Sequence, residues 1–164
     1  MELSRNGVTI KVDDDVVMRI LAEYLSAKQI QRPAYNATVQ RIGAIWPGEG
    51  GIYAGVMRGR DGGPDYHLIV GPEYDGELRW QPAIEWATGL EVDSRKDFTL
   101  PYRNEQALLF ANVAELFRRE YYWSREQHAE DADYAWIQGF GSGSQNNCLK
   151  DGNYRALAVR RVLL

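Results

Sequence analysis

The 164-residue chain contains one cysteine, two histidines and no long apolar run. A single cysteine excludes an intrachain disulfide, and two histidines exclude a three-histidine metal site. Because no 18 consecutive residues are apolar, an ordinary membrane-spanning helix is excluded. The 19 basic and 23 acidic residues give a formal charge of −4, which argues against a basic nucleic-acid groove. We therefore expect no cofactor, no bound metal, no nucleic-acid partner and no membrane insertion.

What is present is the composition of a folded domain. Apolar residues make up 45% and charged residues 26% of the chain, values close to the globular average. The length suits one ordinary domain, which can bury a sizeable core without a disulfide. The 5 Trp, 10 Tyr and 4 Phe include several in short segments separated by glycine. This arrangement favours a compact, loop-rich α+β domain.

The first part of the chain is predicted to form a strand followed by a helix. Val8–Val12 alternates apolar and polar residues, which predicts a short strand. Three aspartates then open a predicted helix over about 13–27, because carboxylates favour the positive end of a helix. Pro33 marks a loop or linker. We therefore divide the chain into a segment 1–45, which packs on its own domain or serves docking or oligomerisation, and a domain 46–164.

Turn residues and apolar spacing also predict the elements of the second part. The predicted strands are 52–57, 66–70, 121–124, 134–140 and 154–162, and the predicted helices are 80–90 and a segment from Pro101 to Phe117. The last strands are expected to form an antiparallel meander, with Gly141–Asn147 as a loop. The predicted elements therefore follow the order of an α+β fold, with a strand first, helices in the middle and strands at the end. Regular βαβ alternation is missing from this order.

Candidate catalytic residues are few. The neighbours of Cys148 offer no activating charge, so the sequence indicates an ordinary thiol. His128 lies in a charged stretch and is expected at the surface. The glycine-rich segments lack both the lysine-ending phosphate loop and the dinucleotide fingerprint, so they are interpreted as turns.

Four segments of the chain form an ordered set of motifs. They are a helix start of the form LP-x-R-x-E, a YWS strand, an AW-x-x-x-F-x-x-G-x-Q strand and loop, and a closing RA-x-AVRR strand. The residues concerned are Leu100, Pro101, Arg103, Glu105, Tyr122, Trp123, Ser124, Ala135, Trp136, Phe140, Gly143, Gln145, Lys150, Arg155, Ala158, Val159, Arg160 and Arg161. Over residues 46–164 this set resembles the C-terminal domain of Legionella collagen-like protein, which is widespread in phages and prophages.

The resemblance implies a C-type-lectin-like fold with an antiparallel sheet and two packed helices. This fold is similar to that of the major tropism determinant of Bordetella phage and, more remotely, to that of formylglycine-generating enzymes. Those enzymes use a cysteine pair and a related branch uses three histidines, both of which this chain lacks. The acidic-Pro-Asn triplet of calcium-dependent lectins is also missing. The resemblance therefore implies a binding protein and not an enzyme.

The resemblance also implies where a ligand binds. In tropism-determinant-like proteins the strand that corresponds to 134–140 and the loop after it carry the residues that vary with the partner. Because the aromatic residues of 134–140 indicate one core face, the alternate residues are expected to point outward. The implied ligand-binding residues are Ile137, Gly139, Ser142, Ser144, Asn146, Asn147, Cys148, Asn153 and Tyr154. Any solvated hairpin also contains Gly, Ser and Asn, so an ordinary turn is the alternative interpretation.

Two functional hypotheses follow from these expectations. The first is a non-enzymatic phage or prophage protein that displays a lectin-like face for host recognition, with a host protein or a surface glycan as its partner. The alternative is an intracellular phage effector that binds and inhibits a host defence protein. The first residues lack the features of a signal peptide, so we expect synthesis in the bacterial host cytoplasm and a final location there or in the virion. Related display proteins often form trimers, so the resemblance allows a homotrimer.

Overall fold

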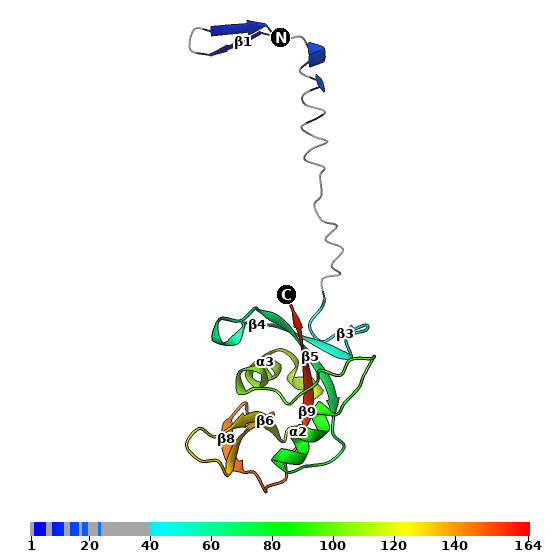
Figure 1. The fold of residues 1–164 in the computed structure, drawn as a ribbon, viewed down its shortest axis with the longest axis vertical. Helices are drawn as coiled ribbons and strands as arrows, with labels where there is room; N and C mark the ends of the chain where they lie inside the picture. The colour runs from blue at the N-terminus through cyan, green and yellow to red at the C-terminus, as the bar shows by residue number, and fades with distance from the viewer. Residues whose placement is uncertain (1, 6–7, 12–13, 17, 20–22, 24–39) are drawn as a thin grey trace. The chain divides into compact units, whose positions relative to one another are not determined.

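The computed structural model describes residues 2–5, 8–11, 14–16, 18–19, 23 and 40–164 (Figure 1). Two compact units divide the chain at Val39/Gln40, whereas the sequence placed the boundary after residue 45. Residues 40–45 belong with the larger unit, where Gly43 N donates to Tyr53 O at 2.8 Å and Tyr53 N donates to Ala44 O at 2.9 Å. Within the described ranges, no helix has the length and apolarity needed to cross a membrane.

The smaller unit contains an antiparallel pair, β1 (Glu2–Arg5) and β2 (Val8–Lys11). β2 confirms the strand that was predicted from Val8, whereas β1 was not predicted. Residues 14–16, 18–19 and 23 are helical, in agreement with the predicted helix. Val12 and the other residues of that predicted helix lie outside the described residues.

The larger unit combines two antiparallel sheets with two helices, which confirms the α+β class (Figure 1). One sheet has the order β3-β4-β5-β9, formed by Ile45–Trp46, Gly51–Met57, Tyr66–Glu73 and Leu157–Leu163. The other has the order β6-β7-β8, formed by Tyr121–Gln127, Tyr134–Gly139 and Gln145–Leu149. The helical elements are η1 (Arg60–Gly62), α2 (Trp80–Thr88), α3 (Arg103–Val113) and η2 (Ala114–Leu116). The helix predicted to reach Phe117 therefore ends at Val113 and continues as η2.

The end of the chain differs from the predicted meander in two ways. β8 is a strand within the segment that was expected to be a loop. β9 leaves the small sheet and pairs with β5, with Val70 opposite Val159. The start of β9 is apolar and buried, and its Leu157 and Val159 share a core cluster with Val70 of β5, which accounts for its place in the larger sheet. The meander therefore consists of β6, β7 and β8 only.

The core forms two clusters on either side of the small sheet. In the first, Leu109 and Val113 of α3 pack with Leu68 of β5 and Phe140, so α3 lies between the two sheets (Figure 1). The second surrounds Trp123, whose side chain is fully buried. The Trp123 indole Nε1 donates to Leu78 O at 2.7 Å, which satisfies its polar atom.

Candidate ligand-binding surface

The predicted ligand-binding residues surround β8, which is the edge strand of the small sheet. Five of them have exposed side chains: Ser142, Ser144, Asn146, Asn147 and Asn153. Their exposure follows from the short polar sequence of this edge strand and of the turns before and after it. The surface therefore presents hydroxyl and amide groups.

Ile137 and Gly139 do not belong to this surface. Ile137 is 4% exposed and packs in the same cluster as Trp123, and Gly139 is buried. A Cβ atom at Gly139 would lie 3.0 Å from the Tyr121 ring. The prediction that Ile137 and Gly139 point outward is wrong because both faces of β7 are covered. The Trp123 cluster covers one face, and on the other Gln138 Nε2 donates to the α3 carbonyl of Gln106 at 2.9 Å.

Cys148 and Tyr154 are half-buried and connect β8 to the core. The Cys148 Sγ and the Tyr154 hydroxyl lie 2.8 Å apart. The Tyr154 ring packs edge-on against Trp123, with centroids 4.9 Å apart. The hydrogen bond with Cys148 and burial raise the pKa of Tyr154 to about 12. These contacts give the two residues a supporting position between β8 and the core.

The opposite face of the β7–β8 pair contains a shallow depression. Asn147 lies across from Trp136 in the strand register. A volume of about 320 Å³ is lined by His128, Asp131, Tyr134 and Asn147. Sequence reasoning included only Asn147 in the site, since it placed Tyr134 in the core and treated His128 as an ordinary surface residue. Tyr134 is half-buried, and its backbone bonds the loop that carries His128 and Asp131, since His128 N donates to Tyr134 O at 2.9 Å and Tyr134 N donates to Asp131 O at 3.2 Å.

The depression offers hydrogen-bond donors, acceptors and an aromatic ring. His128 Nδ1 accepts a hydrogen bond from Glu130 N at 3.3 Å, so the neutral imidazole carries its proton on Nε2. Asp131 Oδ1 accepts from Asp133 N at 3.0 Å, which fixes the carboxylate. The Asn147 amide can both donate and accept. This combination suits a polar ligand that also has an apolar face, such as a sugar ring.

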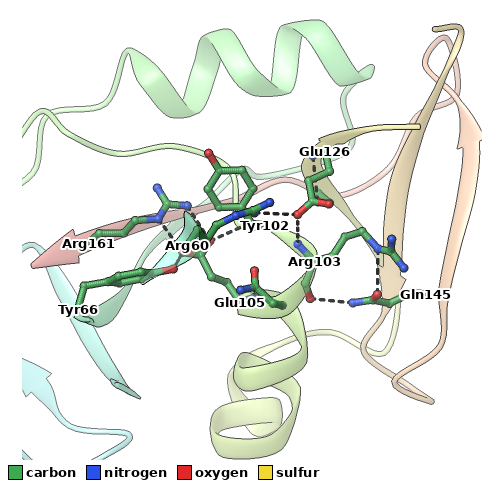
Figure 2. Close-up of polar contacts among 10 residues, drawn as sticks. Arg60, Tyr66, Tyr102, Arg103, Glu105, Glu126, Gln145 and Arg161 are labelled. Carbon is green, nitrogen blue, oxygen red and sulfur yellow. Dashed lines mark hydrogen bonds and ion pairs between the residues drawn. The ribbon is translucent and has the colours of Figure 1, made fainter. Parts of the chain in front are cut away.

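Contacts with the start of α3 hold β8 in place. Arg103 Nε donates to Gln145 Oε1 at 3.1 Å, and Gln145 Nε2 donates back to Arg103 O at 2.8 Å (Figure 2). The same Gln145 amide donates to Gln138 Oε1 at 2.7 Å. The Arg103 guanidinium lies over the Trp136 ring, 3.5 Å from its centroid. The edge strand is thus fixed by side chains as well as by its pairing with β7.

A second depression of about 290 Å³ lies at the C-terminal end of β8. Its lining consists of Asp133, Leu149, Lys150 and Asp151. The Lys150 ammonium already donates to Gln127 Oε1 at 2.6 Å. It also donates to the Ala132 carbonyl, so two of its three N–H donors are engaged.

Neither protein-family models nor curated protein sequences give a match to this chain. The function of the surface is therefore inferred from its own chemistry. The structure brings Asn147 together with His128, Asp131 and Tyr134, and separates this group from the buried Ile137 and Gly139.

Proposed function

We propose that this protein is a non-enzymatic ligand-binding protein of a phage or prophage that recognises its host through a C-type-lectin-like domain. Its binding surface is the edge strand β8 with the adjoining loops. The observation that carries this proposal is the depression lined by His128, Asp131, Tyr134 and Asn147 on a firmly held strand.

The architecture supports the proposed fold. The resemblance implies an antiparallel sheet with two packed helices, and the larger unit has antiparallel sheets and the two helices α2 and α3. The motif residues Leu100, Glu105 and Trp123 are fully buried, as expected of residues that define a fold. Because a fold alone does not identify a ligand, the choice of ligand depends on the chemistry of the depression.

A surface glycan is the partner that this chemistry favours. A sugar ring presents hydroxyl groups to carboxylate, amide and imidazole groups, and its C–H face can lie on an aromatic ring such as Tyr134. The depression has the size of a small-ligand site and is open, which suits the end of a longer chain. A host protein is the other partner considered, because Ser142, Ser144 and Asn146 extend the polar surface beyond the depression.

The intracellular effector is a second candidate function. The observation in its favour is that β8 is a sheet edge, and edge strands can add a strand from a partner protein. Mass spectrometry of purified virions separates the two functions. Presence of the chain in virions supports host recognition, and its absence from virions together with capture of a host defence protein supports inhibition.

The binding test uses the purified full chain on host cells and on a glycan array. Tyr134→Ala and Asn147→Ala should each weaken binding about tenfold, which corresponds to about 1.4 kcal/mol. Gln81→Ala is the matched control, since Gln81 is an exposed amide on α2 that belongs neither to β8 nor to the depression. Unchanged binding by folded Tyr134→Ala and Asn147→Ala proteins would place the binding site elsewhere.

A further inference from the structure

Three guanidinium groups surround the ring of Tyr102, the residue before α3. The guanidinium carbons of Arg60, Arg161 and Arg125 lie 4.0, 4.7 and 5.7 Å from the ring centroid. They come from η1, β9 and β6, so segments far apart in the sequence meet here (Figure 2 shows Arg60, Arg161 and Tyr102). The ring of Tyr102 is thus the meeting point of three cationic side chains.

Two of the three guanidinium groups are held by carboxylates. Arg161 donates to Glu105 through Nε at 2.6 Å and through Nη2 at 2.7 Å. Arg60 Nη1 donates to Glu126 Oε1 at 3.0 Å. A guanidinium has five N–H donors, so each group has donors that these bonds do not use. Because the side chains are already oriented, less conformational entropy is lost when they bind a further group.

Arg125 carries the third guanidinium group, and its hydrogen-bond partner is a hydroxyl instead of a carboxylate. Its Nη1 donates to the Thr99 hydroxyl at 3.0 Å, and its side chain is exposed. Across the described ranges, Arg125 makes no ion pair with a carboxylate. Arg60, by contrast, is influenced by Asp61 as well as by Glu126. Arg125 is therefore the member of the cluster whose guanidinium is exposed and not held by a carboxylate among the described residues.

The backbone of α3 does not provide this site. Tyr102 N donates to Glu105 Oε2 at 2.7 Å, and Arg103 N donates to Glu126 Oε1 at 3.2 Å. Glu105 N donates to Asn104 Oδ1 at 3.0 Å. Since these first N–H groups already have acceptors, a ligand here would be bound by the guanidinium groups.

We propose that Arg125, Arg60 and Arg161 bind a phosphate or sulfate group beside the Tyr102 ring. Guanidinium groups bind phosphate through paired N–H donors. A tetrahedral oxyanion offers oxygens in several directions and so suits three guanidiniums better than a carboxylate, which offers two. This site is distinct from the depression beside Tyr134 and adds a second ligand contact to the protein. The group is either free phosphate or a substituent of a larger host molecule.

The test is an NMR titration of the full chain that follows the arginine Nε–Hε signals. Sodium phosphate and sodium sulfate are added at constant ionic strength, with sodium chloride as the reference salt. We expect saturable shifts at Arg125 and Arg60, and at least tenfold weaker binding in Arg125→Ala and in Arg60→Ala. Arg79→Ala is the control, because Arg79 is exposed and outside the cluster, and its affinity should stay within twofold.

Further variants and ligands decide the remaining alternatives. Arg125→Lys keeps the charge but loses the planar donor pair, so it should bind phosphate more weakly than wild type. Equal affinity in Arg125→Lys would overturn the proposal, as would unsaturable shifts or an equal loss in Arg79→Ala. Tighter binding of glucose 6-phosphate than of inorganic phosphate supports a substituent on a sugar, and the reverse order supports free phosphate. These shifts are read at arginine signals, so they are independent of glycan binding at Tyr134.

Discussion

Glu105 and Arg161 form a two-point ion pair that joins the start of α3 to the closing strand β9. Glu105 is fully buried, and its carboxylate also accepts a 2.7 Å hydrogen bond from the Tyr66 hydroxyl. The first residue belongs to the LP-x-R-x-E segment and the second to the RA-x-AVRR segment. Two motifs recognised separately in the sequence are thus in contact in the structure.

Replacing Glu105 by alanine should destabilise the protein strongly. The change leaves Arg161 and the Tyr102 N–H without their acceptor, and breaking a buried pair costs about 3–5 kcal/mol. Urea unfolding of the full chain measures the loss. Glu91→Ala is the control because Glu91 pairs with Lys96 at the surface, at 3.2 Å, where about 1 kcal/mol or less is expected. Similar losses in the two variants would contradict the structural role of Glu105.

Gly143→Ala should also destabilise the protein, through a steric clash. Gly143 has a φ of 77°, and an added Cβ would lie 2.7 Å from Cε1 of Phe110. Gly48 has a φ of 79° but nothing within 4 Å of such an atom, so Gly48→Ala carries only the backbone penalty of about 1–2 kcal/mol. The difference between the two unfolding free energies isolates the Phe110 contact. An equal loss would show that Phe110 moves aside without cost.

The stability of the protein should fall between about pH 10 and pH 12. Burial, followed by the hydrogen bond to Glu105, raises the pKa of Tyr66 to about 12 from an ordinary value of 10. Burial raises the pKa of Tyr122 to about 12 as well, with Glu73 adding to the effect. The folded state therefore retains protons that the unfolded state loses above pH 10, and stability decreases as the pH rises.

Thermal melts from pH 9 to pH 12 measure this decrease. Tyr122→Phe removes one of the titrating groups, so its midpoint should fall less steeply than that of wild type above pH 10. The comparison is made between slopes because Tyr122→Phe also loses a 3.0 Å hydrogen bond to Glu73 at every pH. Identical slopes would mean that Tyr122 does not stay protonated in the folded protein.

The sequence predicted the strands and helices in which apolar residues recur at a regular spacing. The strands near 52–57 and 66–70 and the helix near 80–90 are present because apolar spacing and glycine-rich turns determine them locally. β8 was missed because its sequence QNNCL is polar and lacks the alternation of a half-buried strand. The predicted orientation of Ile137 was wrong because β7 is covered on both faces. In such a strand, the alternation of residue types does not show which side chains are exposed.

The candidate sites were harder to predict than the elements. Asn147 was identified through the resemblance, but His128 and Asp131 come from the turn between β6 and β7 and carry no pattern that links them to it. The arginines around Tyr102 come from three separate elements. Their proximity depends on the pairing of β9 with β5, and the sequence predicted β9 in the other sheet. Side-chain clusters of this kind can be identified only when the order of the strands in the sheets is known.

The last prediction distinguishes residues that stabilise the fold from residues that bind the partner, within the ligand-binding site predicted from the sequence. Asn146→Lys with Asn147→Lys changes two exposed side chains, so stability should shift by about 0.5 kcal/mol or less while host-cell binding is lost. Tyr154→Ala should instead lower stability, because it removes the Trp123 contact and leaves Cys148 without its hydroxyl partner. Thermal melts and a cell-binding assay on the same samples measure both properties. If the folded double variant kept full binding, β8 would not be the recognition surface, whereas an unchanged melting temperature in Tyr154→Ala would contradict its supporting position.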